Sequence, residues 1–545
     1  MAFFAGNEAG GASLYGSYFD KAAAAQPQQG TDAGAAEPPQ PKQATAGDGG
    51  EEAEDPLHYV FASRTMQAAH ACECRAFPAQ GLPSNVAYQL AADARNLDAN
   101  PRLNLASFVT TWIEREAMDL MTESLNVNFV DAEEYPSCVE MEAACCRMLL
   151  DLFHAPDIRD GRGTDGSAIG TATVGSSEAI MLAGIAFKMR WKAARVAAGL
   201  SPDVKPNLVI GAHAQVCWHK LCVYLDIACR EEPVEEGRYH ATPEGLASLV
   251  DEETIAVVAI LGSTYNGGFD PVAEIDAAVR AASESRAIGP VPMHVDAASG
   301  GFVAPFLYPD LPWDFRLPSV CSINVSGHKY GFVVPGIGWQ LWRSKDDVPE
   351  AMIFQTNYLG SDLPSLTVNF SRGASQVVAS YYTLNRLGRA GFTRIIQNLH
   401  TVAMRLADGI VALGCFELVS DPAKGLPLVA WRIKPGDTTL SCTEFDIAAK
   451  LREAGWVLPA YTWPKNRADS RLMRAVVRED FSAAMCDRLL ADLRRCVAYW
   501  TVHRVTEVAP PDATGAASEG EHGALLAALA LAKARLKARR HGGVC

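Results

Sequence analysis

Short apolar runs of strand length alternate with stretches of helical periodicity through the middle of the chain. The runs at 207–211 and 255–261 are apolar at consecutive positions, which predicts strands buried on both faces. Similar runs occupy 291–296, 320–326 and 337–342. The helical stretches are 137–153, 176–199, 374–388, 393–413, 443–454 and 482–500. Buried strands that alternate with helices predict an α/β domain with a mostly parallel central sheet.

The pattern changes in the last quarter of the chain. Short strand candidates at 416–420, 427–433 and 472–477 are interleaved with the last two predicted helices. Helices and short strands in this order predict a second, smaller α+β domain.

The two ends of the chain differ in composition from the rest. Residues 1–55 are rich in Ala, Gly, Pro and Gln and carry nine acidic residues against two lysines, so we expect them to be disordered. Residues 507–522 form a polar linker, and 523–540 is rich in Ala and Leu with five basic residues. The expected organisation is therefore an N-terminal extension at 1–55, an N-terminal segment at 56–102, a large domain at 103–398, a small domain at 399–505, and a linker with a basic tail at 506–545.

Charge and composition exclude several functional classes. The 545 residues include 48 Lys and Arg against 63 Asp and Glu, which gives a formal net charge of −15. This acidic balance argues against binding to nucleic acid or to an anionic membrane. No apolar run approaches the roughly 20 residues that cross a bilayer, and residues 1–55 fit neither a secretory nor a transit signal. We expect a soluble, cytoplasmic protein whose 14 cysteines are reduced.

Three local patterns match known motifs but lack the context that those motifs require. Gly161–Gly166 matches GxGxxG, yet the preceding residues are turn-like, so we expect a surface loop. Ser326–Lys329 matches SxxK without the other motifs of acyl-serine enzymes. The Cys and His groups at 72–74, 145–146 and 213–219 have no second pair at zinc-ligand spacing, so no metal site is predicted.

Lys329 directly follows an apolar strand, in the segment Asn324–Gly331. An ammonium group at a strand end needs a partner or solvent. The same position suits a lysine whose amine is neutral and forms a Schiff base with a carbonyl cofactor. For Lys329 taken alone, a solvated loop lysine is the alternative.

Asp296 closes the apolar strand of Pro292–Gly301 and precedes small residues that let a flat ligand approach the backbone. His294 lies two positions earlier, on the same face of the strand. A buried carboxylate needs a cationic partner, and the protonated ring nitrogen of pyridoxal 5′-phosphate (PLP) is such a partner. An Asp that caps the next element is the alternative.

Ser176 and Ser177 follow Gly175 at the start of a long predicted helix. Free backbone N–H groups, two hydroxyls and the positive end of the helix can together bind a phosphate group. An ordinary helix N-cap is the alternative. The three segments together supply a phosphate site, a partner for a pyridinium and a reactive lysine.

In these segments the sequence resembles the PLP-dependent decarboxylases of the aspartate-aminotransferase fold type, and more closely the glutamate decarboxylases. The resemblance runs from about Phe61 to Arg504 and is carried by the motifs Leu103–Trp112, Asn128–Asp131, Gln215–Trp218, His294–Gly301, Ser326–Lys329 and Asn369–Arg372. It implies a large PLP-binding domain at 103–398 and a reaction that converts L-glutamate to 4-aminobutanoate (GABA) and CO2. It also implies a homo-oligomer, with a dimer as the minimum and a hexamer as the larger candidate.

The resemblance implies roles for the residues of the cofactor site. Lys329 would carry PLP, Asp296 would keep the ring nitrogen protonated, and His328 would join them as a catalytic residue. The residues implied to contact the cofactor are Ser176, Ser177, Gln215, Thr264, Asp296, Ala298, Ser326, His328 and Lys329. Gln215 stands where aromatic-amino-acid decarboxylases carry a histidine, which favours the glutamate branch.

The resemblance also implies which residues bind the substrate. Arg474 would hold the α-carboxylate through a bidentate guanidinium. The segment for the distal carboxylate would comprise Ser107, Phe108, Asn128 and Asp131. Asp131 can face the substrate's distal carboxylate if it is protonated or shares a proton with it. Substrate binding would then be stronger in mild acid. Tyr358 and Leu359 would lie on a loop that reaches a neighbouring subunit's site.

The C-terminal tail is similar to those of plant glutamate decarboxylases, which bind calmodulin through C-terminal segments. Leu525, Leu529 and Leu536 form one helical stripe within 523–540, as in a helix that enters an acidic, apolar groove. A helix packed on a neighbouring subunit and a solvated basic tail are the alternatives. Ser107 is also plant-like, and the chain lacks the short histidine-bearing tail of bacterial relatives.

Two other functions stay open at this point. A decarboxylase for aspartate or cysteine sulfinate would differ mainly in the depth of its pocket, which the sequence does not define. A non-catalytic scaffold of the same fold would not need Lys329, Asp296 and Arg474, all of which are present.

Overall fold

The computed structural model describes residues 77, 81–159, 161, 167–356 and 363–503. The chain divides into two compact units, Met1–Arg95 and Asn96–Cys545. The described part of the first unit contains helix α3 (Ser84–Arg95), none of whose residues is buried. The predicted disorder of 1–55 and the predicted tail helix lie outside the described residues. All elements below belong to the second unit.

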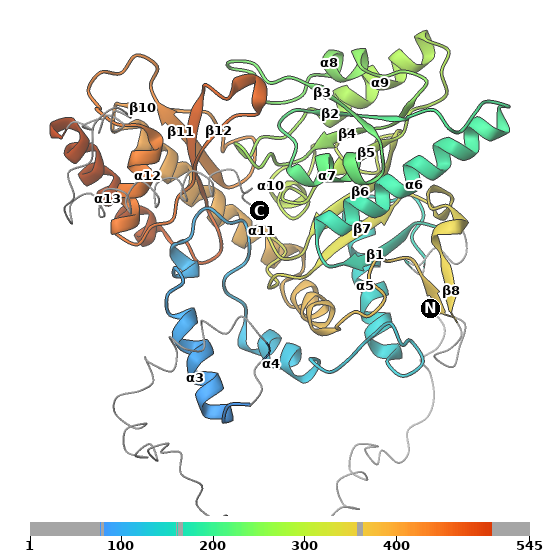
Figure 1. Ribbon diagram of the computed structural model, residues 1–545, viewed down its shortest axis with the longest axis horizontal. Coiled ribbons are helices and arrows are strands. Elements are labelled where there is room, and N and C mark those ends of the chain that lie inside the picture. The colour runs from blue at the N-terminus through green and yellow to red at the C-terminus, as the bar shows by residue number, and fades with distance from the viewer. Residues whose placement is uncertain (1–76, 78–80, 160, 162–166, 357–362, 504–545) are drawn as a thin grey trace, which may run out of the picture. The chain divides into compact units, whose positions relative to one another are not determined.

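A seven-stranded sheet forms the centre of the second unit, in the order β1-β7-β6-β5-β4-β2-β3 (Figure 1). Its strands are β1 (Ile169–Thr173), β2 (Asn207–Gly211), β3 (Ala228–Glu232), β4 (Thr254–Ile260), β5 (Met293–Asp296), β6 (Val320–Ser326) and β7 (Gly338–Trp342). Strands β2 to β6 pair in parallel, whereas β7 pairs antiparallel with β6 and β1. The predicted mostly parallel sheet is therefore confirmed. Every residue of β4 is buried, as its consecutive apolar positions require, and every residue of β6 is buried although Ser322, Asn324 and Ser326 are polar.

Helices connect the parallel strands and precede the sheet. The helices that follow β1 to β5 are α6 (Ser176–Ala197), α7 (Val216–Tyr224), α8 (Pro243–Ser248), α9 (Val272–Ser285) and α10 (Ala304–Leu307), and those that precede β1 are α4 (Arg115–Glu123) and α5 (Pro136–Leu152). Parallel strands need such crossovers, because each strand must begin at the same edge of the sheet.

A four-stranded antiparallel sheet of order β10-β11-β13-β12 forms the smaller region. Its elements are β10 (Phe416–Leu418), β11 (Leu428–Ile433), α12 (Glu444–Glu453), β12 (Ala460–Thr462), β13 (Arg471–Val476) and α13 (Ala483–Val502). The predicted smaller α+β region is confirmed. A two-stranded sheet, β8 (Phe354–Thr356) with β9 (Leu363–Ser365), and the 3-10 turns Pro101–Leu103, Lys345–Asp347, Glu350–Met352 and Lys465–Arg467 complete the described elements.

Helix α11 (Ser375–Val411) links the two sheets. The sequence predicts two helices here, and the structure breaks the helical backbone at Gly388, where φ is 54°. Glycine adopts this left-handed conformation without the steric cost that a side chain would bring. The helix packs against α4, α5, α13 and β10, and it runs through the expected domain boundary at 398–399. The division into domains therefore stays a prediction.

Several elements were not predicted from the sequence, among them β1, β3, β12 and helices α7 to α10. Strand β3 contains Arg230, Glu231 and Glu232 and lies at the edge of the sheet, so it lacks the apolar signal of a buried strand. Among the described residues, no helix is long and apolar enough to span a bilayer. The cysteines in the described ranges are free thiols.

Candidate active site

The candidate site lies at the carboxyl ends of β5 and β6. These parallel strands pair Asp296 with Asn324, so the loops that follow them begin side by side. The first loop carries Ser299 and the second carries Lys329. In open α/β sheets, ligands bind at this edge, where the strand ends converge.

Lys329 points back toward the loop after β5. Its Nζ donates a hydrogen bond to Ser299 Oγ at 3.0 Å, and its backbone carbonyl accepts one from Thr110 Oγ1 at 2.6 Å. Burial of the amine lowers the pKa of Lys329 below its usual range, although the charge of nearby Asp296 opposes this shift. A larger fraction of neutral amine at working pH is what a lysine needs to act as a nucleophile.

Three donors hold the buried Asp296 carboxylate. Trp218 Nε1 donates to Oδ2 at 2.8 Å, while Asn324 Nδ2 and the Ala298 backbone N–H both donate to Oδ1 at 3.1 Å. Only 5% of Asp296 is exposed, so these bonds replace the water that an isolated carboxylate would bind. The carboxylate is therefore fixed in place on the side of the site formed by α7 and β6.

A chain of hydrogen bonds continues from Asp296 through Asn324 to His294. Because Asn324 donates its amide to Asp296, its Oδ1 faces His294 Nε2 at 2.7 Å. His294 must then carry its proton on Nε2, and its Nδ1 accepts from Ser322 Oγ at 2.6 Å. Burial lowers the pKa of His294 to about 4, so the ring is neutral. His294 acts on Asp296 through Asn324 and not by direct contact.

Helix α6 begins beside the end of β6, as the phosphate interpretation requires. Ser176 Oγ and Ser326 Oγ lie 2.5 Å apart. His328 Nδ1 is buried and has no hydrogen-bond partner among the described residues. A Cβ at Gly175 would lie only 3.1 Å from His328 Cε1, so glycine permits this approach. Burial, reinforced by the charge of Lys329, lowers the pKa of His328 to about 4, so this ring is also neutral.

Arg474 reaches the same site from β13 of the small sheet. Its Nη2 donates to the Ala106 carbonyl at 2.9 Å and its Nη1 donates to the Thr264 carbonyl, while the buried Nε has no described partner. The ring centroid of Phe108 lies 5.0 Å from Arg474 Cζ and 5.4 Å from Lys329 Nζ. Side chains from the loop after β6 and from β13 therefore converge on one aromatic ring.

Comparison with known proteins agrees with this geometry. Residues 78–434 match the model of the pyridoxal-dependent decarboxylase conserved domain. The chain belongs to the pyridoxal-dependent decarboxylase family. It is 48% identical to glutamate decarboxylase 5 of Arabidopsis thaliana, over 81% of this chain and 87% of that protein, and 42% identical to the glutamate decarboxylase of Aliivibrio fischeri, over 77% and 88%. The solved glutamate decarboxylase of Lactobacillus brevis matches with a TM-score of 0.74 and 39% identity, over 79% of this chain and 96% of that one.

The groups gathered in this decarboxylase fit PLP, the cofactor of the family. Lys329 offers an amine of lowered pKa, and Asp296 offers a fixed carboxylate for a ring nitrogen. Ser176 and Ser326, together with the start of α6, offer donors for a phosphate group. The unpartnered Nδ1 of His328 faces the same region, where a ligand atom can satisfy it.

Some predicted cofactor residues make different contacts in the single chain of this decarboxylase. Ser177 is exposed, and no hydrogen bond of its hydroxyl is found in the described part of the chain. Gln215 Oε1 accepts from the Cys217 backbone N–H at 2.7 Å and so caps helix α7. Thr264 contributes its carbonyl to Arg474, and Ala298 contributes its N–H to Asp296.

Three predicted substrate residues have no hydrogen bond, ion pair or ring contact with Lys329 or Arg474 within the described ranges. Their side chains instead accept from nearby backbone N–H groups: Ser107 from Val109, Asn128 from Arg372 and Asp131 from Glu134. Asn128 is exposed. The predicted loop residues Tyr358 and Leu359 lie outside the described residues. Of the predicted substrate set, the structure therefore brings together only Phe108 and Arg474.

Trp218, Asn324 and Ser299 contact the central groups but were not predicted as site residues. Asn324 lies within the motif that led to Lys329, and Trp218 lies in a motif shared with glutamate decarboxylases. Their hydrogen bonds join residues that are 78, 28 and 30 positions apart in the sequence. Only the folded arrangement of β5, β6 and α7 identifies these partners.

Proposed function

We propose that this chain is a PLP-dependent glutamate decarboxylase that converts L-glutamate and a proton to GABA and CO2. The observation that carries the proposal is the convergence of Lys329, Asp296 and Arg474 on one site that Phe108 borders. An amine, a fixed carboxylate and a buried guanidinium are the three charged groups that this reaction requires. The identity to glutamate decarboxylases from plants and bacteria supports glutamate as the substrate.

The cofactor would be held at three points. Lys329 would bind it covalently through the amine, and Asp296 would pair with its ring nitrogen. Ser176, Ser177 and Ser326, with His328, bind the phosphate, while Gln215, Thr264 and Ala298 border the ring. Asp296 keeps a proton on the ring nitrogen because its carboxylate is already oriented by Trp218 and Asn324.

The chain's own residues then orient the substrate and manage its protons. Arg474 binds the α-carboxylate, and Ser107, Phe108, Asn128 and Asp131 form the region for the distal carboxylate. Bound PLP supplies the electron sink that accepts the bonding pair as CO2 leaves. The protonated amine of Lys329 would act as the general acid that donates a proton to Cα. Ser299, 3.0 Å from Lys329 Nζ, positions that amine.

The experiment that tests this proposal is a substrate profile of the purified protein supplied with PLP. We expect CO2 release from L-glutamate to exceed that from L-aspartate and L-cysteine sulfinate in kcat/KM. One methylene of difference in pocket depth is worth about 10–200-fold in specificity. A preference for aspartate or cysteine sulfinate would identify the chain as a decarboxylase of that amino acid. If none of the three substrates released CO2, the result would support a non-catalytic scaffold.

Replacing Arg474 with Met should lower kcat/KM for L-glutamate by more than tenfold. The variant loses a charge-assisted hydrogen bond to the substrate carboxylate, worth roughly 1.5–3 kcal/mol. Arg471→Met is the matched control, because Arg471 is an exposed residue of the same strand. Steady-state kinetics of both variants give the comparison. Equal efficiency in Arg474→Met and wild type would place the carboxylate clamp elsewhere.

We also propose that the enzyme is a cytoplasmic homo-oligomer, a dimer or a hexamer. Ser177 and Asn128 are exposed in the single chain although both belong to the proposed site. A neighbouring subunit that covers them would complete the site. The molar mass of the holoenzyme, measured by light scattering, gives the oligomeric state.

The C-terminal tail is proposed to be regulatory. In this proposal 523–540 suppresses activity at neutral pH, and calcium-loaded calmodulin relieves the suppression by binding its apolar and basic residues. Deletion of 507–545 should then raise activity near pH 7, and a 520–545 peptide should bind calmodulin only with calcium. Unchanged activity together with no binding would leave the tail as a packing or solubilising segment.

A further inference from the structure

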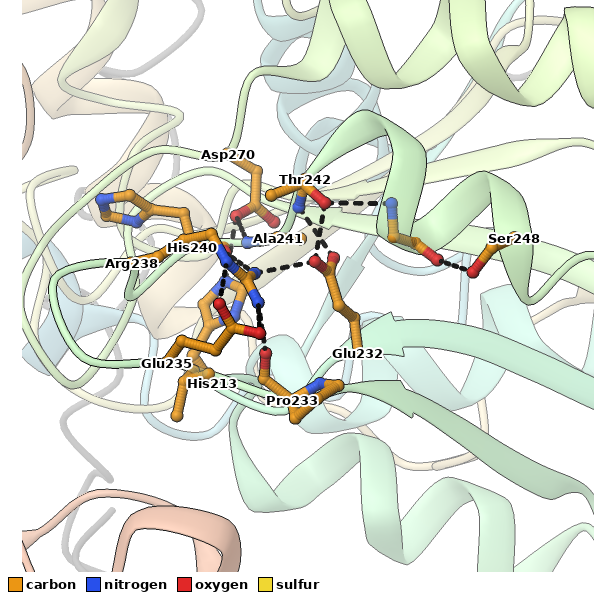
Figure 2. Close-up of polar contacts among 12 residues, drawn as sticks. His213, Glu232, Pro233, Glu235, Arg238, His240, Ala241, Thr242, Ser248 and Asp270 are labelled. Atoms are coloured by element: carbon orange, nitrogen blue, oxygen red, sulfur yellow. Dashed lines mark hydrogen bonds and ion pairs between the residues drawn. The ribbon is translucent and has the colours of Figure 1, made fainter.

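Edge strand β3 carries two pairs of side chains that point to opposite faces, since residues alternate along a strand. Arg230 and Glu232 point toward the segment around α8. Arg230 Nη1 donates to the Leu249 carbonyl at 2.9 Å. Glu232 accepts from Thr242 and Arg238, each at 2.7 Å (Figure 2). Cys229 and Glu231 therefore lie on the other face of β3.

Helix α7 lies against that other face and offers His219 and Cys222. These residues are three positions apart, so both lie on one side of the helix. His219 Nε2 is 2.8 Å from Glu231 Oε1, and Cys222 lies about one turn further along the same side of α7. Helix α7 thus contributes His219, and β3 contributes Cys229 and Glu231, to one cluster.

The donor atoms of this cluster are close enough to share one ion. His219 Nε2, Cys229 Sγ and a Glu231 carboxylate oxygen all lie within 4.8 Å of one another. Tetrahedral Zn²⁺ with bonds of about 2.0–2.3 Å needs its ligands about 3.3–3.8 Å apart, so binding would adjust the spacing of these donors. The His219 and Glu231 side chains are 41% and 37% exposed, so an ion can enter from solvent.

We propose that His219, Cys229 and Glu231 form a binding site for a single Zn²⁺-like cation, with Cys222 as the fourth donor. Imidazole, thiolate and carboxylate are the ligand types that Zn²⁺ takes, and the sulfur donors disfavour Mg²⁺ and Ca²⁺. Binding releases the protons of the thiols, so it strengthens as pH rises. The ion would tie α7 to β3, and α7 also carries Trp218, which holds Asp296.

A salt bridge between His219 and Glu231 is the simpler explanation of their contact. It does not account for the Cys229 thiol, which lies within 4.8 Å of both donor atoms. The strength of an exposed ion pair between His219 and Glu231 would not depend on Cys229. Dependence of metal binding on Cys229 therefore separates the two explanations.

The test is equilibrium dialysis of chelator-treated, reduced holoenzyme against Zn²⁺, with a parallel Cd²⁺ titration followed by thiolate charge-transfer absorbance. We expect wild type to hold one more Zn²⁺ per chain than Cys229→Ser, and the Cd²⁺ band of that site to disappear in the variant. Cys138→Ser, a half-buried cysteine of α5, is the matched control and should bind like wild type. Zn²⁺ bound by the other cysteines is the same in all three proteins. It therefore cancels when the Zn²⁺ content of each variant is subtracted from that of wild type.

Two further variants keep the test decisive if Cys229→Ser fails to fold. His219→Gln should weaken Zn²⁺ binding at this site at least about tenfold, because it removes one of the ligands. Cys222→Ser should retain the Zn²⁺ but lose about half of the Cd²⁺–thiolate absorbance of the site. Equal Zn²⁺ content in wild type, Cys229→Ser and His219→Gln would overturn the proposal. If Cys222→Ser kept the full Cd²⁺–thiolate absorbance of the site, Cys222 would not be its fourth ligand.

Discussion

Alanine in place of Lys329 is expected to abolish steady-state turnover while the protein still folds. The variant loses the amine that, in the proposed mechanism, would bind the cofactor covalently and donate a proton to Cα. Loss of the proton-transfer role alone costs about 10²–10⁴-fold in rate. CO2 release from L-glutamate with added PLP measures the effect, and circular dichroism and the absorbance spectrum report the fold and the bound cofactor.

Lys424→Ala is the control for this prediction, because its side chain is 85% exposed on the surface. It should keep both the rate and the spectrum of wild type. Substantial turnover by Lys329→Ala would contradict the role assigned to that lysine. Loss of folding in Lys329→Ala is not expected, since the site's other groups are held by their own hydrogen bonds, as Asp296 is by Trp218 and Asn324.

Asparagine in place of Asp296 should leave some PLP bound but remove most of the rate. A neutral amide no longer stabilises a proton on the ring nitrogen, so the electron sink weakens. The lost charge-assisted interaction is worth roughly 1.5–3 kcal/mol, or about 10- to 150-fold in kcat. The measurement is kcat at saturating PLP and glutamate, beside the amount of PLP retained after gel filtration.

Asp314→Asn provides the matched control for a buried carboxylate. Asp314 is 1% exposed and pairs with Arg316 and His154, outside the proposed site. Its replacement should lower the free energy of unfolding but leave kcat per folded enzyme unchanged. A kcat for Asp296→Asn near that of wild type would show that another group stabilises the ring nitrogen.

The buried strands could be predicted from the sequence because their signal is local. Residues 207–211 have the apolar centre Leu208–Ile210 and coincide with β2, and the run at 320–326 coincides with β6. Strand β3 could not be predicted, since Arg230, Glu231 and Glu232 suit an edge position that exists only once the sheet has formed. The same strand then supplies two residues of the proposed metal site.

The placement of Lys329 and Asp296 at one edge of the sheet could be predicted for a similar reason. Lys329 and Asp296 lie at strand ends in short motifs, and the parallel pairing of β5 and β6 brings those ends together. Trp218 and Asn324 could not be predicted as partners of Asp296, because their contacts depend on how α7 and β6 pack around it. The substrate roles of Ser107, Asn128 and Asp131 stay predictions.

The measurement that tests the central claim most directly is the NMR spectrum of the product formed from L-glutamate in ²H₂O. Loss of the α-carboxylate followed by protonation at Cα adds one solvent hydron there. We predict GABA with a single deuterium on the carbon that bears the amine, formed in equal amount to CO2 and only when PLP is present. Formation of 2-oxoglutarate in place of GABA, or no product at all, would contradict the account.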